Sequence, residues 1–129
     1  MLTNITYKVI ILKIYGINYY TEPNGHKPVP EWLDNLDRNA RAVIMDKVVR
    51  LEENGLTLLG TNMMKRIENQ DKDFYELVGG RYRIALYHEV ISNSFILLHG
   101  FIKKRQRETR EISIARSRLH EYLSRRQIL

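Results

Sequence analysis

The sequence predicts an α+β fold, in which an antiparallel sheet of four or five strands has helices packed on one side. Apolar residues recur at the 3.6-residue spacing of a helix between residues 30 and 54. After Gly60 the spacing changes to the two-residue alternation of strands, which continues to residue 102. A second helical stripe follows from Thr109. The predicted order of elements is therefore β-α-α-β-β-β-β-α.

The first predicted strand, residues 7–20, is rich in β-branched and aromatic residues. A turn signal, Glu-Pro-Asn-Gly, follows at residues 22–25. Pro30 suits the first position of a helix, and Glu31 behind it favours the positive end of the helix dipole. We expect this short helix to continue through Leu36.

A second helix is expected after Asp37, whose carboxylate can cap the amino terminus of the helix. The Asn54-Gly55 pair supplies a left-handed stop. The two helices are typical of an αα-hairpin. The inward stripe of the second helix comprises Ala40, Ile44, Val48 and Leu51, with Val43 beside them.

The next four strands are expected at residues 63–68, 74–78, 81–88 and 95–102. Gly79-Gly80 is a natural hairpin turn. The last of these strands is apolar on both faces apart from His99, which indicates a central strand.

The carboxy-terminal segment contains a predicted helix, residues 109–126, and the whole excess of positive charge. Thr109 can cap this helix, and Glu111 favours its first turn. Residues 1–102 contain 12 basic and 12 acidic residues, whereas residues 103–129 contain 9 basic and 3 acidic residues, which gives the net charge of +6. Such asymmetry favours a polyanionic partner, but a solvated basic helix has the same composition.

The composition also excludes several classes of protein. The chain has no cysteine, so disulfides, thiol nucleophiles and thiolate metal sites are excluded. No run of twenty apolar residues occurs, and the short apolar run at residues 9–12 lies between two lysines. We expect one cytoplasmic domain over residues 1–129, with no membrane partner.

Several motifs resemble those of the phage-derived, HigB-like branch of the RelE/ParE superfamily. The resemblance extends over residues 14–126. The matching segments are GHKPVPEWLDNL at 25–36, FYEL at 74–77, GRYRI at 80–84, LLHGFIKK at 97–104, and Glu111-Ile112 followed by Ala115-Arg116.

The resemblance implies a RelE-like fold with a twisted and partly mixed sheet. It implies the toxin of a type II toxin–antitoxin system, which enters the ribosomal A site and cleaves mRNA without metal or cofactor. The implied partners are a helix-turn-helix antitoxin and, through the antitoxin, promoter DNA. Residues 1–13 form an atypical extension. Members of this family usually have arginine after the Glu-Leu of the hairpin, where this chain has Val78 and a shorter turn, and Arg81 is the possible replacement.

Metal-free RNA cleavage uses the 2′-hydroxyl as nucleophile and needs a base, an acid, and cations for the phosphorane charge. His99 is the candidate acid or base, although a buried histidine bonded to a neighbouring element fits the same position. Arg81 and Arg83 share a face, about 7 Å apart. They can grip phosphate or pair with Glu76 or Glu68.

Further cations can line a cleft for RNA or the ribosome. Lys103 can also serve as a general base. Tyr87 is in phase with the two arginines and can stack on a base or fill the sheet face. The proposed edges of the cleft are Lys103, Lys104, Arg105 and Arg107 on one side and Lys65 and Arg66 on the other.

Two alternatives stay open from the sequence. A gyrase-directed toxin resembling ParE would use the same scaffold without a catalytic constellation. A degenerate toxin that only binds its antitoxin or nucleic acid is favoured by Val78.

Overall fold

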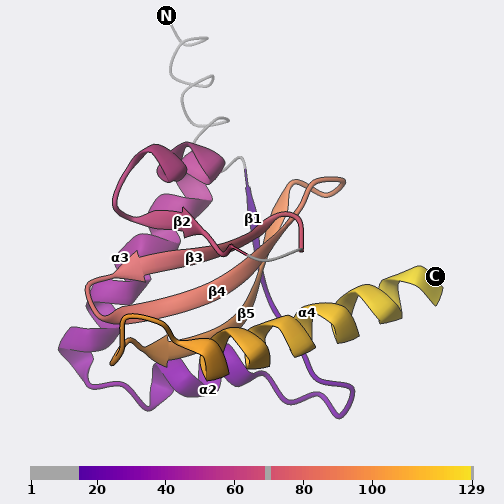
Figure 1. The fold of residues 1–129 in the computed structure, drawn as a ribbon, viewed down its shortest axis with the longest axis horizontal. Helices are drawn as coiled ribbons and strands as arrows, with labels where there is room; N and C mark the ends of the chain where they lie inside the picture. Colours follow the sequence, from indigo (N-terminus) through magenta and orange to yellow (C-terminus); the bar gives the residue numbers. More distant parts are fainter. Residues whose placement is uncertain (1–14, 69–70, 129) are drawn as a thin grey trace, which may run out of the picture.

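A twisted five-stranded sheet runs through the middle of the molecule, in the order β1-β5-β4-β3-β2 (Figure 1). The computed structural model describes residues 15–68 and 71–128. Strand β1 is parallel to β5, and the other neighbouring strands are antiparallel. The predicted α+β fold and the interior position of β5 are confirmed. The strands are β1 Gly16–Tyr19, β2 Met64–Arg66, β3 Phe74–Gly79, β4 Tyr82–Glu89 and β5 Ser94–Ile102.

Within the described residues, the strand predicted for residues 7–20 is shorter than expected. Its described part is β1, Gly16–Tyr19, and residues 7–14 lie outside the described residues. The atypical extension predicted for residues 1–13 also falls outside them.

Side chains satisfy the free backbone groups where the first two helices meet. The Asp37 carboxylate accepts a hydrogen bond from the Ala40 amide at 2.8 Å, so the predicted cap is confirmed. The Arg41 guanidinium donates to the carbonyl oxygens of Leu33 and Asp34, at 2.9 and 3.0 Å, where helix α2 ends. The helices are α2 Pro28–Asp34, α3 Arg38–Asn54, the 3-10 helix η1 Gly55–Gly60, and α4 Thr109–Ile128.

Two helix starts differ from the prediction. Helix α2 begins at Pro28 rather than Pro30, because proline suits either position of a first turn. Thr109 is the first residue of α4 and therefore does not cap it. Glu108 precedes this helix.

Helices cover both faces of the sheet, so the prediction of helices on one side was wrong (Figure 1). Alternate residues of the central strands are apolar on each face, and each face therefore needs a cover. Helices α2 and α3 cover one face, and α4 covers the other. The first core includes Val29, Leu33, Ile44, Val48, Leu51, Leu77, Ile84, Leu86, Phe95 and Leu97. The second includes Tyr20, Phe74, Ala85, Ile96, Leu98, Ala115 and Leu119.

The inward stripe of α3 is buried as predicted, at Ala40, Ile44, Val48 and Leu51. Val43, expected beside them, is 43% exposed. Successive residues of a helix point about 100° apart, and the sheet contacts the side that Ile44 faces.

A β-bulge interrupts the pairing of β4 with β5. Ala85 pairs with His99 and Leu86 with Leu97, which leaves Leu98 without a partner in β4. Strict alternation from Leu97 would direct His99 toward α2 and α3. Because of the bulge, His99 instead lies on the α4 face, and Gly100 lies against Trp32 of α2.

The carboxy-terminal half of α4 is tied to the β4–β5 hairpin by the buried carboxylate of Glu89. This carboxylate accepts hydrogen bonds from Tyr122 at 2.5 Å and Ser92 at 2.6 Å, and it pairs with Arg126 at 3.0 Å. Burial opposes ionisation, but these contacts lower the pKa of Glu89. Burial and the hydrogen bond to Glu89 raise the pKa of Tyr122 to about 12.

No helix in residues 15–68 or 71–128 combines the length and the apolar character needed to cross a bilayer.

Replacing Gly100 with Ala should destabilise the fold by about 1–3 kcal/mol. A Cβ atom there would lie 2.1 Å from Cε3 of Trp32, so the ring would have to move. Urea unfolding measures the effect. Gly60→Ala is the matched control, because a Cβ at Gly60 meets nothing within 4 Å. Equal stability of the two variants would contradict the close packing of Trp32 on β5.

Candidate nucleic-acid interface

The cross-strand register brings polar side chains together on the α4 face, near the start of that helix. Lys65 of β2 pairs with Glu76 of β3, Glu76 with Ala85 of β4, and Ala85 with His99 of β5. Directly paired residues lie on the same face, so these four form one row across the sheet. The small side chain of Ala85 separates the carboxylate from the imidazole.

A second row lies beside the first, toward the β3–β4 turn. It contains Val78, Arg83 and Phe101. One step further, the Lys103 amide donates to the Arg81 carbonyl oxygen at 2.7 Å, so these two cations lie at neighbouring strand ends. Val78, where the resemblance to the family led us to expect arginine, lies directly beside Arg83 in this row.

Glu76 is a buried carboxylate that pairs with two of the predicted cations. It lies 3.1 Å from Lys65 Nζ and 3.4 Å from Arg83 Nη1. Arg83 Nε also donates to the Gly80 carbonyl oxygen at 3.1 Å, and the Arg83 side chain is only 13% exposed. Arg83 was expected either to bind phosphate or to pair with a carboxylate, and in this structure it pairs with Glu76. From the sequence, Glu76 was expected only as a possible partner of the arginines, whereas it lies between Lys65 and Arg83 and pairs with both.

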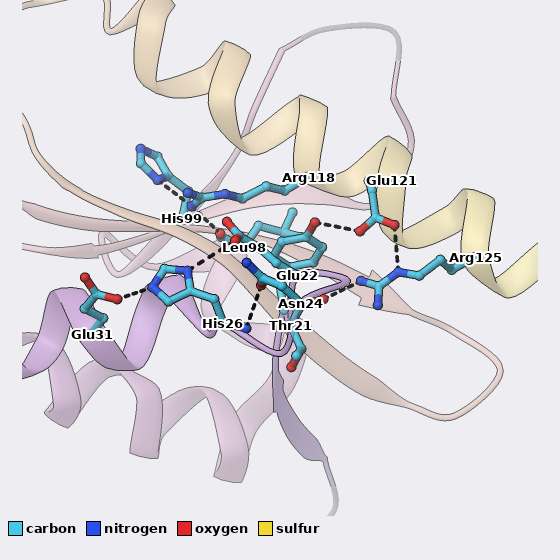
Figure 2. Close-up of polar contacts among 11 residues, drawn as sticks. Thr21, Glu22, Asn24, His26, Glu31, Leu98, His99, Arg118, Glu121 and Arg125 are labelled. Carbon is cyan, nitrogen blue, oxygen red and sulfur yellow. Dashed lines mark hydrogen bonds and ion pairs between the residues drawn. The ribbon is translucent and has the colours of Figure 1, made fainter.

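His99 is largely buried between β5 and α4, and its ring contacts three other side chains. Nδ1 lies 2.9 Å from Arg118 Nη1, and Nε2 lies 3.4 Å from a Glu111 carboxylate oxygen. The ring stacks on Phe101 with centroids 5.7 Å apart. Figure 2 shows Arg118 reaching from α4 to both His99 and the Leu98 carbonyl oxygen.

The surroundings of His99 favour its neutral form. Burial, followed by the positive charge of Arg118, lowers the pKa of His99, and Glu111 opposes this shift. Both α4 partners of this ring were missed, because the motif that contains His99 ends at Lys104 and Glu111 was given a role only in the first turn of the helix. Their only sequence signal was the spacing of seven residues, which places Glu111 and Arg118 on one side of the helix, at the edge of its apolar stripe.

The loop from Lys103 to Glu108 presents the predicted cationic cluster. Glu108 Oε1 accepts hydrogen bonds from the backbone amides of Lys104 and Arg105, both at 2.6 Å. These two bonds, that to Lys104 first, lower the pKa of Glu108. The side chains of Lys104, Arg105 and Arg107 are exposed, and none of them forms an ion pair with another described residue.

The first turn of α4 divides the predicted site into two hollows that share Glu108. Residues from the two expected edges of the cleft do face each other across the first hollow, whereas His99 lies in the second. The first is lined by Lys65, Arg66, Glu76, Lys103, Arg107 and Ile112, among others. The second is lined by residues that include Trp32, His99, Phe101, Lys104, Arg105, Arg110 and Glu111.

Tyr87 belongs to neither hollow. It packs in the α4-side core against Tyr122, with ring centroids 6.3 Å apart, and burial raises its pKa. Tyr87 therefore fills the sheet face, which is one of the two roles expected for it. Arg66 lies over the ring of Tyr75, 5.5 Å from its centroid, while lining the first hollow.

Outside the two hollows, the remaining histidines have carboxylate, amide or ring partners. His26 contacts Glu22 and Glu31 in the turn before α2 (Figure 2). His120 lies 2.8 Å from Asp71, and His88 stacks on Phe95. Among the described residues, no group of three or more His, Cys, Asp and Glu side chains is arranged to hold a metal ion.

Comparisons with known proteins identify a family and a similar solved structure. Residues 31–120 match the model of the family described as phage-derived protein Gp49-like (DUF891). No curated protein matches this chain in sequence. The chain is similar to a chain of the toxin–antitoxin complex RelBE2 from Mycobacterium tuberculosis, with a TM-score of 0.45 and 13% identity, covering 69% of this chain and 98% of that chain.

Replacing Glu108 with Ala should speed hydrogen exchange at the amides of Lys104 and Arg105, because their acceptor is removed. NMR exchange rates measure this effect. In the unmodified protein, the protection should persist above the ordinary glutamate pKa and disappear as the pH falls through the lowered one. Glu53→Ala, on the exposed surface of α3, is the control. Unchanged exchange in Glu108→Ala would show that the loop is held in another way.

Proposed function

The chain belongs to the Gp49-like family of RelE-like toxins, and on that premise we propose that it is the toxin of a type II toxin–antitoxin system and cleaves mRNA on the ribosome. The RelE-superfamily membership predicted from the sequence motifs is thereby confirmed. We propose mRNA on the ribosome as the target and cleavage of its backbone as the reaction, and the contacts around the two hollows support this proposal.

The observation that carries the proposal is the group of unpaired cations on the loop before α4. Several arginines elsewhere on the α4 side have carboxylate partners: Arg83 has Glu76, Arg116 has Asp71, and Arg126 has Glu89. Among the described residues, Lys104, Arg105 and Arg107 have no carboxylate at ion-pair distance, although the charge of Arg105 acts on Glu108. Exposed cations without internal partners are typical of a surface that binds a phosphate backbone.

We assign the phosphate contacts to both sides of the divided site. Arg81 and Lys103, joined through their backbones at neighbouring strand ends, hold the phosphate next to the scissile bond. Arg83 joins them by leaving Glu76, whose charge Lys65 continues to balance at 3.1 Å. His99 reaches the phosphate from the second hollow, beside Lys104 and Arg105.

In this reaction the 2′-hydroxyl oxygen loses its proton and attacks the phosphorus, the bond to the 5′-oxygen breaks, and that oxygen takes up a proton. The products are a 2′,3′-cyclic phosphate and a 5′-hydroxyl. The charge that develops on the phosphorane is what the cations stabilise. DNA lacks the attacking hydroxyl and is not a substrate. Because α4 separates the two groups of residues, free RNA contacts them poorly, and we propose that the ribosome presents the mRNA to both.

The proposed partners follow from the same assignment. An antitoxin with a helix-turn-helix domain neutralises the toxin, and the pair binds promoter DNA through the antitoxin. The site requires no cofactor in this mechanism, and the proposed location is the cytoplasm, where ribosomes and mRNA meet.

The second candidate is a toxin-derived module that binds without cleaving. Val78 in place of the usual arginine favours it, as do the ion pair of Arg83 and the two partners of His99. A gyrase-directed toxin on this scaffold is the third outcome that the experiment must separate.

The triple substitution K103Q/K104Q/R105Q should relieve growth arrest after induction without antitoxin. It should also reduce mRNA cleavage in a translation extract. If all three residues contact phosphates, the slope of log affinity against log salt for single-stranded RNA falls by about two. The matched control, R38Q/K47Q/R50Q, removes equal charge from α3 and should leave all three readouts unchanged.

The alternatives give different results in the same experiments. Normal growth and intact mRNA on inducing the unmodified protein would favour the binding module. Growth arrest with intact mRNA and inhibited gyrase supercoiling would favour the gyrase-directed toxin. Full cleavage by the loop variant would contradict the proposed role of these cations.

A further inference from the structure

Arg118 connects the β-bulge to the imidazole that lies next to it. Its Nη1 donates to the Leu98 carbonyl oxygen at 2.9 Å and also lies 2.9 Å from His99 Nδ1. Leu98 is the residue that the bulge leaves without a partner in β4. The guanidinium is half-buried and therefore has little freedom to reach other partners.

We infer that Arg118 is a positioning residue that fixes His99 as the neutral tautomer with its hydrogen on Nε2. A guanidinium has donors and no acceptor, so a hydrogen bond from Arg118 requires a lone pair on Nδ1. In a neutral imidazole the hydrogen is then on Nε2, which faces Glu111 at 3.4 and 3.5 Å. The Glu111 contacts are longer than the Arg118 contact, which makes Arg118 the stronger determinant.

Burial and the cations around the ring favour the neutral imidazole, whereas the Glu111 carboxylate opposes it. The second hollow contains Arg110, Lys104 and Arg105 as well as the carboxylates of Glu111 and Glu108. A second proton on the imidazole would lie on Nδ1, directly against the Arg118 guanidinium. Burial and Arg118 together lower the pKa of His99, in agreement with the geometry.

The consequence for catalysis rests on the proposed function. His99 would meet an RNA phosphate as a neutral N–H donor, not as an imidazolium acid. A non-bridging phosphate oxygen replaces the Glu111 carboxylate as the acceptor for Nε2–H, and no proton leaves the ring. Lys104 and Arg105, which line the same hollow, supply the positive charge that attracts the phosphate.

The test is NMR of the full-length protein labelled with ¹⁵N in its histidines, because nitrogen shifts separate the two tautomers and the imidazolium. We expect His99 to have an unprotonated Nδ1 and a protonated Nε2 at neutral pH. Arg118→Met should produce a mixed tautomer population and raise the pH at which His99 titrates. Arg118→Lys keeps a donor and should restore the original signature.

Arg116→Met is the matched control. It removes another α4 guanidinium that has a carboxylate partner, Asp71 at 2.6 Å, and should leave the His99 signals unchanged. An imidazolium or an Nδ1–H tautomer in the unmodified protein would overturn the inference, even if Arg118→Met failed to fold. An identical His99 signature in Arg118→Met would overturn it as well.

The NMR readout does not depend on RNA cleavage. If the unmodified protein leaves mRNA intact while His99 has the expected tautomer, the proposed function fails and the positioning role of Arg118 stands. If mRNA is cleaved and the tautomer differs, the opposite holds.

Discussion

The register of β5 against β4 is the constraint on which the arrangement of this molecule depends. Because Leu98 is unpaired, Leu98 and His99 both lie on the α4 face, and Phe101 follows on that face, while Gly100 accommodates Trp32 of α2. The same slip leaves the Leu98 carbonyl available to Arg118. A single extra residue in the strand thus positions the imidazole, the aromatic anchor of the short helix, and a polar contact of the long helix.

Internal ion pairs determine which part of the positive charge can meet a ligand. The excess of +6 lies in residues 103–129, but several cations there have internal partners. Arg116 pairs with Asp71, Arg125 with Glu121 and Arg126 with Glu89. The charge that is free to bind is therefore concentrated at the amino-terminal end of α4, and the rest of the helix contributes to stability.

Local patterns were sufficient to predict the α-helices and strands in their order, whereas the 3-10 helix η1 was not predicted. The stripe of α3, the cap at Asp37 and the interior position of β5 depend on neighbours along the chain, which the sequence displays directly. The face that α4 covers was not predictable in this way. An apolar stripe shows that a helix is packed but does not identify its partner, and the exposed Val43 shows that a stripe also has an uncertain edge.

The site was less predictable than the fold, because its geometry depends on partners far away in the sequence. The residues themselves came from the motifs, but the pairing of Arg83 with Glu76 follows from the β3–β4 register. The partners of His99 lie 12 and 19 residues further along the chain. The bulge has no sequence signal at Leu98, and without it alternation alone misplaces the imidazole relative to Leu97.

The Glu89 cluster gives the end of α4 an asymmetric response to acid and base. Its carboxylate is ionised below the usual range for glutamate, so the tie to Tyr122 and Arg126 weakens only when the pH falls through that lowered value. On the alkaline side, the Tyr122 hydroxyl remains a donor until the pH approaches about 12. Acid therefore frays the helix from its carboxy terminus, whereas moderate alkali leaves that attachment intact.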